Sequence, residues 1–147
     1  MTVNIPLELT VSTEYMPQVA RAVVNVILFH RILTLTQPEC GVALGTTYCK
    51  LGNDAIRKNI DDKLNGIAYP FSVDFLDLSP PSWFGRESAW ESWQISIKPD
   101  TQPHGGRERS RKQLVQALMY ISQETSLKKD HLPALSTVPF PYDIKAR

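Results

Sequence analysis

The segment that most constrains the fold is an apolar run with helical spacing near the N-terminus. Its apolar residues are Met16, Val19, Ala20, Val23, Val24, Ile27 and Leu28. They recur at the three- and four-residue spacing of an α-helix, and only Gln18, Arg21 and Asn25 form a narrow polar stripe between them. A surface helix keeps a wider polar face. We therefore predict a central, mostly buried helix, preceded by cap-type residues at positions 12–14.

Five segments have the two-residue period of β-strands. They are residues 3–11, 41–49, 71–75, 93–97 and 138–144. Pro6 places the first strand near a sheet edge, and the apolar phase shifts after Phe75, which indicates a bulge or a strand end. Pro139 and Pro141 remove N–H donors from one edge of the last segment, so this strand would pair on one side only.

Two further helices complete the predicted fold. The residues Gly-Asn-Asp at 52–54 open a helix that ends at the Asn-Gly of residues 65–66, and its thin apolar stripe is typical of a surface helix. A third helix is predicted over about residues 107–125, with one apolar face. The order of elements predicts an α+β fold, with a mixed or antiparallel sheet packed against about three helices.

Composition argues against several classes of function. The 16 Lys and Arg residues nearly balance 15 Asp and Glu residues, so no strong field attracts nucleic acid or anionic lipid. No apolar run reaches the roughly 18 residues of a membrane span, and no signal-peptide pattern is present. We expect a soluble, intracellular protein. Cys40 and Cys49 have no metal-ligand spacing, so we expect no metal or disulfide framework and predict two small buried thiols.

Catalytic motifs are equally weak. His30, His104 and His131 have no motif that links them to a nucleophile or a carboxylate, and we expect neither catalysis nor a cofactor. His30 and Arg31 end the first helix, where a capping role is favoured over catalysis. The Gly-Gly of residues 105–106 precedes a helix and could cradle an anion, but without a Walker-type motif a turn is the better interpretation.

A basic run begins the third helix. Arg107, Arg109, Arg111 and Lys112 are interrupted by Glu108, without the interleaved aromatic residues of single-strand binders. We favour a solvated face, with the acidic patch of a protein partner as the second interpretation and nucleic acid or lipid as the third.

The most informative loop reads Ser-Pro-Pro-Ser-Trp-Phe-Gly-Arg-Glu over residues 79–87. Neither strand nor helix periodicity accounts for the adjacent Trp83 and Phe84. They could plug the core, since burial stabilises aromatic side chains. Alternatively they form an exposed anchor for a partner, because tryptophan on a rigid loop is typical of interaction sites.

Four pieces of the sequence carry a family resemblance. In order they are Val-Ile-Leu-Phe-His-Arg at residues 26–31, the Trp83-Phe84 pair, Trp-Glu-Ser-Trp-Gln-Ile-Ser-Ile at residues 90–97 and Asp-His-Leu-Pro at residues 130–133. Together they resemble the autophagy-related protein 101 family of HORMA-domain proteins, from the first strand to about residue 133.

This resemblance implies a non-catalytic adaptor of the autophagy-initiation kinase complex, cytoplasmic and at the phagophore assembly site. It implies a heterodimer with the HORMA domain of autophagy-related protein 13, which it protects. It also implies that Trp83 and Phe84 form the exposed Trp-Phe (WF) finger that recruits other autophagy-initiation factors. In animal relatives a proline usually separates these two aromatic residues, whereas here they are adjacent.

We accordingly expect residues 1–147 to form one HORMA domain, shorter at its C-terminus than animal relatives and therefore a fixed, open-like partner that wraps no peptide by itself. Spindle-checkpoint relatives dimerise through their third helix, which points to Arg111 and Gln116. Two alternatives stay open: a HORMA adaptor of a chromosome, checkpoint or DNA-repair pathway, and a ubiquitin-conjugating-like enzyme with Cys40 or Cys49 as its thioester site. The latter lacks the His-Pro-Asn motif of such enzymes.

Overall fold

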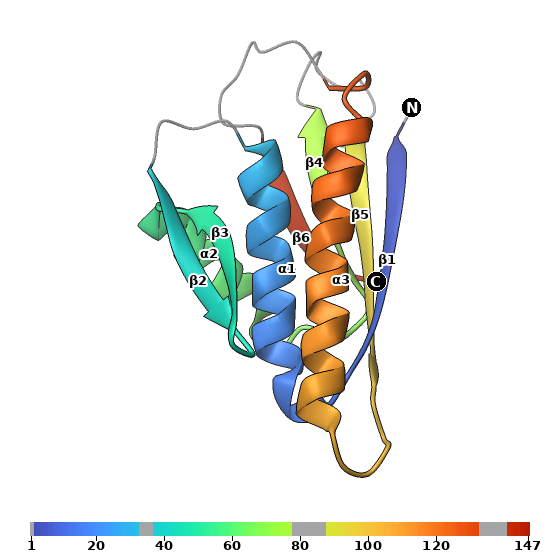
Figure 1. The fold of residues 1–147 in the computed structure, drawn as a ribbon. Coiled ribbons are helices and arrows are strands. Elements are labelled where there is room, and N and C mark those ends of the chain that lie inside the picture. Colours follow the sequence, from blue (N-terminus) through green and yellow to red (C-terminus); the bar gives the residue numbers. More distant parts are fainter. Residues whose placement is uncertain (1, 33–36, 78–87, 133–140) are drawn as a thin grey trace.

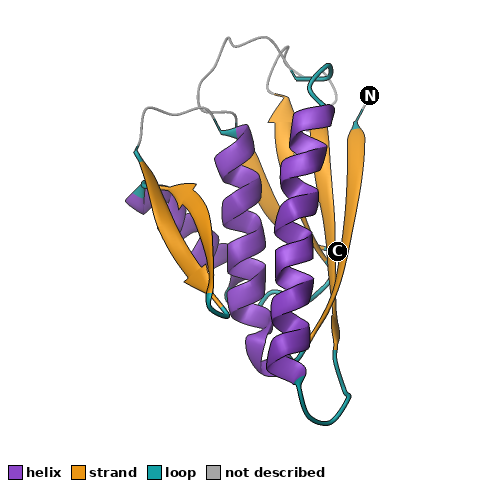
Figure 2. Ribbon diagram, viewed as in Figure 1, coloured by secondary structure: helices purple, strands orange, loops and turns teal. Residues whose placement is uncertain are grey.

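The computed structural model describes residues 2–32, 37–77, 88–132 and 141–147 (Figure 1). Its elements are β1 (Val3–Val11), a 3₁₀ turn (Thr13–Tyr15), α1 (Met16–Arg31), β2 (Pro38–Ala43), β3 (Thr46–Leu51), α2 (Asp54–Leu64), β4 (Phe71–Asp77), β5 (Ser88–Pro99), α3 (Gly106–Leu127) and β6 (Tyr142–Ala146). Three α-helices and a mixed sheet within these ranges confirm the predicted α+β class and the HORMA-like arrangement (Figure 2).

The main sheet has the strand order β1-β5-β4-β6. β1 runs parallel to β5, and β4 runs antiparallel to both β5 and β6. β1 therefore lies at an edge, as Pro6 predicted. The β4–β5 register shifts between Phe75 and Leu76, which confirms the predicted bulge, and β6 lies at the opposite edge and pairs on one side. Residues 138–140 of the predicted last strand lie outside the described residues.

Helices α1 and α3 lie side by side across one face of this sheet (Figure 1). The sheet buries alternate apolar side chains beneath them, among them Ile5, Leu9, Phe71, Phe75, Trp93 and Ile95. Eleven residues of α1 are buried, so the prediction of a central helix is confirmed. α2 is a surface helix, as predicted, because Ile60 is its one fully buried residue. Its cap is Asn53, whose Oδ1 accepts a hydrogen bond from the Ile56 N–H at 3.0 Å.

The prediction of one strand over residues 41–49 is wrong. The structure has an antiparallel hairpin instead, β2–β3, with a two-residue turn at Leu44 and Gly45. Both turn residues have positive φ angles, 51° and 73°, as a tight hairpin turn requires. Leucine rarely adopts this conformation, so of the two turn residues only Gly45 is of a type that predicts a hairpin turn. β3 packs against α1, where Tyr48 and Leu44 are buried.

Candidate functional site

The proposed finger residues Trp83 and Phe84 lie outside the described residues, but the described structure defines both ends of their loop. Asp77 and Ser88 are the last partners of the β4–β5 ladder, so the chain leaves and re-enters the sheet at directly opposed positions. The C-terminal ends of α1 and α3 lie at the same end of the molecule (Figure 1). The Leu76 N–H donates to the Pro141 carbonyl at 2.9 Å and ties the bulge of β4 to the segment that precedes β6.

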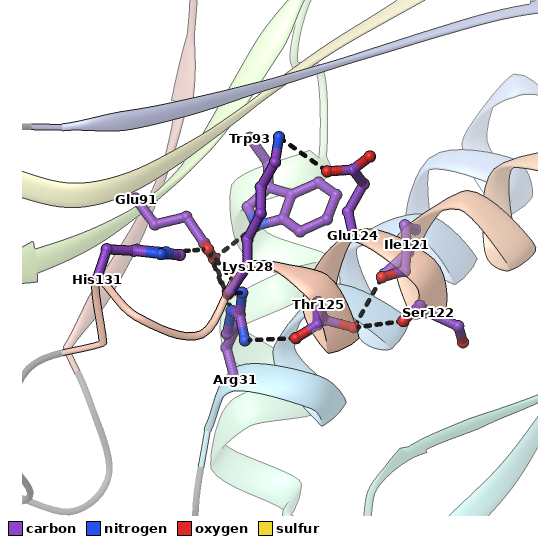
Figure 3. Close-up of polar contacts among 9 residues, drawn as sticks. All are labelled: Arg31, Glu91, Trp93, Ile121, Ser122, Glu124, Thr125, Lys128 and His131. Atoms are coloured by element: carbon purple, nitrogen blue, oxygen red, sulfur yellow. Dashed lines mark hydrogen bonds and ion pairs between the residues drawn. The ribbon is translucent and has the colours of Figure 1, made fainter.

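A buried ion pair holds this end of the molecule together (Figure 3). Arg31, the last residue of α1, directs its guanidinium to Glu91 on β5, and the two side chains are 3% and 0% exposed. The contact is bidentate: Nε lies 2.9 Å from Oε2 and Nη2 lies 2.9 Å from Oε1. This geometry matches the planar guanidinium fork to the planar carboxylate. It fixes the end of α1 against the sheet.

Arg31 also reaches the end of α3. Its Nη2 donates to the Lys128 carbonyl at 2.7 Å, and its Nη1 donates to the Thr125 carbonyl at 3.3 Å. The last carbonyls of a helix have no partner within the helix, so these bonds satisfy acceptors that would otherwise be left open. The prediction that Arg31 caps its own helix is therefore wrong, because its side chain crosses to α3 and β5.

Glu91 receives two further donors. Trp93 Nε1 donates to Oε2 at 2.8 Å, and His131 Nε2 lies 2.7 Å from Oε1. A carboxylate only accepts hydrogen bonds, so the His131 proton lies on Nε2 in this contact. His131 follows α3 and also contacts the Trp90 ring, with centroids 5.8 Å apart. The cluster of Arg31, Glu91, Trp93 and His131, here called the buried charge cluster, thus joins α1, β5 and the segment after α3.

The chemistry of the buried charge cluster is structural. All five contacts to the Glu91 carboxylate come from donors, and the Arg31 guanidinium is surrounded by acceptors, so both buried charges are compensated. Within the described residues no group of three or more His, Cys, Asp or Glu side chains could hold a metal ion. The helices in that part of the chain lack the length and apolarity needed to cross a membrane.

Sequence reasoning did not assign this cluster, although one signal was present. Position 91 shares the odd-numbered phase of Trp93, Ile95 and Ile97, so a glutamate there falls on the apolar face of a strand. A charge in that position predicts a buried partner of opposite sign. The sequence did not reveal which cation that partner was, because Arg31 is 60 residues away.

The two residues proposed for the dimer face both lie on α3. Arg111 is held by Glu108, with Nη2 2.7 Å from Oε1, and this contact lowers the pKa of the Glu108 carboxyl. Gln116 is exposed and lines a shallow groove with Pro6, Glu8 and Tyr120. Five residues correspond to about 140° of helical rotation, so Arg111 and Gln116 do not point in the same direction.

Two other arginines of the basic run, Arg107 and Arg109, contact groups within the protein. Arg109 pairs with Asp100, with Nε 2.8 Å from Oδ2, and also donates to carbonyls of the preceding loop. The guanidinium of Arg107 lies 5.9 Å from the centroid of the Tyr15 ring. Gly105 has a φ angle of 74° and is the N-cap of α3, whereas Gly106 is already the first residue of the helix, so the predicted turn ends at Gly105.

The prediction of buried cysteines is wrong. Cys40 and Cys49 are both exposed, on the outer face of the β2–β3 hairpin, and they stand directly opposite each other in its register. The preference of free cysteine for burial was overridden because the inner face of this short hairpin is occupied by other side chains, including Ala43 and Tyr48.

Comparison of the amino-acid sequence with known protein families gives a match over most of the chain. A family model described as autophagy-related protein 101 matches residues 8–138. The chain belongs to the autophagy-related protein 101 family. No curated protein gives a significant match.

The match extends over most of the chain, from β1 to the segment before β6. It spans both the loop with Trp83 and Phe84 and the complete buried charge cluster. This member of the autophagy-related protein 101 family is therefore an autophagy-related protein, as the resemblance implied.

Proposed function

We propose that this protein is a non-catalytic adaptor of the autophagy-initiation kinase complex, consisting of one HORMA domain over residues 1–147. In this proposal it forms a heterodimer with the HORMA domain of autophagy-related protein 13 and stabilises it. It recruits further autophagy-initiation factors through Trp83 and Phe84, in the cytoplasm and at the phagophore assembly site. The observation that carries the proposal is the family match over residues 8–138, which includes both aromatic residues.

The surroundings of the loop support the finger. Because Asp77 and Ser88 are paired in the ladder, the loop has two anchored ends on adjacent strands. Glu91, the fourth residue of β5, is bound by Arg31 of α1, which also donates to carbonyls at the end of α3. A rigid base reduces the entropy lost when a loop binds a partner. Aromatic side chains on such a base are typical anchors of protein interfaces.

The exposed side of α3 supports a dimer face on this helix. Met119 and Leu127 are 68% and 72% exposed, two of the three large apolar side chains that are strongly exposed in the described residues. Burial of such side chains contributes most to protein association. Arg111 and Gln116 would then lie in or beside the interface, and their different directions on the helix require a partner surface that reaches around α3.

The heterodimer is tested by co-expression with the HORMA domain of autophagy-related protein 13, followed by size-exclusion chromatography with light scattering. We expect one complex of one-to-one stoichiometry. We also expect the partner domain to unfold at a higher temperature in the complex, because binding to the native state stabilises it by mass action. Two separate, folded monomers at micromolar concentration would contradict the proposal.

The dimer face is tested with Arg111→Glu and Gln116→Arg. We expect each to weaken the complex about tenfold or more if the residue lies in the interface core. The matched control is Arg57→Glu on α2, because Arg57 is also exposed and also pairs with an acidic residue three positions before it, Asp54. Equal affinities for the control and both α3 variants would exclude this face.

The finger is tested with the double variant Trp83→Ala plus Phe84→Ala. We expect the variant to keep its thermal unfolding midpoint and its heterodimer but to lose recruitment of downstream factors in cells. The control is Val42→Ala, which truncates an exposed apolar residue on the β2–β3 hairpin. A variant that unfolds or loses the dimer would show instead that the two aromatic residues belong to the core.

A further inference from the structure

The β2–β3 hairpin carries both cysteines of the chain on opposed residues. Cys40 lies on β2 and Cys49 on β3, and the register pairs them directly. Both are exposed, so oxidants and alkylating reagents can reach them. Neither residue takes part in the buried charge cluster or in the proposed interaction surfaces.

The type of pair they form follows from the turn. In a two-residue hairpin the residues that flank the turn, here Ala43 and Thr46, form a hydrogen-bonded pair. Along an antiparallel ladder, hydrogen-bonded pairs then alternate with non-hydrogen-bonded pairs. The alternation makes Cys40–Cys49 a non-hydrogen-bonded pair. The far end of the hairpin agrees, because the Gly52 N–H donates to the Gln37 carbonyl at 3.0 Å, as a hydrogen-bonded position requires.

This pair type is suited to a covalent bridge. Opposed residues of a non-hydrogen-bonded pair have Cα atoms about 4.5 Å apart, with their side chains on the same face. Disulfides span Cα separations of about 4.4 to 6.8 Å. The two thiols can therefore meet without a change in the backbone register.

The register is firmly specified. The turn residues Leu44 and Gly45 both have positive φ, which fixes the two-residue connection. On the inner face the Tyr48 ring lies across Gly41, at a position where a Cβ on residue 41 would overlap the ring. Tyr48 is itself buried at 8% exposure. A slip of one residue would expose Tyr48, so the opposed arrangement of the thiols is maintained.

We propose that Cys40 and Cys49 are an oxidation-sensitive modification site that a peroxide converts into an intramolecular disulfide. One thiolate attacks a peroxide oxygen and breaks the O–O bond, which leaves a sulfenic acid and releases water or an alcohol. The second thiolate attacks that sulfur, the S–S bond forms and hydroxide leaves and takes up a proton. In sum, two thiols are oxidised to a disulfide while one hydrogen peroxide is reduced to two water molecules.

Oxidation at this site cross-links the hairpin without moving it. The bridge would join residues at the centre of the six-residue ladder, so the two strands could no longer separate while Tyr48 and Leu44 stay packed on α1. The site does not depend on the heterodimer or the finger, and the isolated protein suffices to test it.

The test is mass spectrometry after oxidation. The folded protein is treated with hydrogen peroxide, its remaining thiols are blocked by alkylation, and it is digested with trypsin. Both cysteines fall in one tryptic peptide, residues 32–50, because no Lys or Arg lies between Arg31 and Lys50. We expect this peptide to carry no alkyl group and to be lighter than the reduced peptide by about 2 Da, the mass of two thiol hydrogens, until a reductant restores it.

The matched control moves one thiol along the same strand. Cys40→Ser plus Val42→Cys keeps two thiols on the outer face, since Val42 is 67% exposed and has Thr47 opposite it. This places the thiols on a diagonal with Cα atoms roughly 7 to 8 Å apart, beyond the usual range of a disulfide. We expect the control peptide to keep two alkylatable thiols or to become oxidised without a bridge. Equal bridging in both proteins, or sulfinic acids and cross-linked dimers in place of the bridge in the natural sequence, would overturn the proposal.

Discussion

Removing Glu91 should destabilise the protein far more than removing any exposed charge. In Glu91→Leu the Arg31 guanidinium keeps the Thr125 and Lys128 carbonyls as acceptors but loses both carboxylate oxygens, and the Trp93 N–H also loses its acceptor. An uncompensated buried charge costs about 3–5 kcal/mol. The total stability of a domain is only about 5–15 kcal/mol, so the variant should lie close to the limit of folding at 37 °C.

The two halves of the pair should not be equivalent. In Arg31→Met the carboxylate of Glu91 keeps donors from Trp93 and His131, so the remaining charge stays partly compensated. We expect this variant to lose less stability than Glu91→Leu. The double variant Arg31→Met plus Glu91→Leu removes both buried charges and should recover much of the loss, because apolar replacements of buried ion pairs are often neutral or better.

The assay is urea unfolding followed by circular dichroism, which avoids the direct effect of the substitutions on Trp93 fluorescence. Arg21→Met is the control, because Arg21 and Asp61 form an exposed pair with 52% and 47% exposed side chains, and its loss should cost at most about 1 kcal/mol. A Glu91→Leu variant no less stable than this control, or a double variant no more stable than Glu91→Leu, would show that the buried ion pair does not stabilise the fold in this way.

Three further outcomes follow from local features. Asn53→Ala removes the side-chain acceptor of the Ile56 N–H and should cost about 1 kcal/mol in urea unfolding. In Gly45→Ala the added Cβ meets no neighbouring atom, so we expect the free energy of unfolding to fall by about 1 kcal/mol only because alanine is strained in the left-handed backbone at φ 73°. An unchanged free energy of unfolding would contradict the turn geometry. The pKa of His30 is lowered, first by partial burial and then by the Arg31 charge, so the unfolded chain takes up the proton before the folded protein as the pH falls below about 6.5. Between about pH 7.5 and pH 5 the natural protein should therefore lose more stability than His30→Gln, which urea titrations at both pH values would detect.

Much of the fold could be predicted because its elements have strong local periodicity. The alternation of residues 3–11 fixed which side chains of β1 are buried, and Pro6 indicated an edge position that the sheet order confirms. The nearly continuous apolar surface of α1 predicted that this helix is central and mostly buried, and in the structure it packs between the sheet, α3 and the hairpin. In each case the pattern reflects which face of one element avoids water.

Predictions failed where a preference of the residue type competed with its place in the fold. Leu44 occupies a positive-φ turn position that usually holds asparagine or glycine, so the hairpin appeared as one strand. Cys40 and Cys49 belong to a residue type that is mostly buried, yet the outer face of a short hairpin leaves them exposed.

The class of the fold, the buried faces of its main elements and, through four ordered motifs, the family could all be inferred from the sequence alone. The sequence also marked Trp83 and Phe84 as residues that no regular element explains. Two further features could be seen only in three dimensions: Arg31, Glu91 and His131 share one buried cluster, and the two cysteines face each other across a ladder. Hydrophobic periodicity indicates which residues of a single helix or strand are buried. Partners 60 residues apart, as Arg31 and Glu91 are, depend on which faces of separate elements meet, and that is decided by packing.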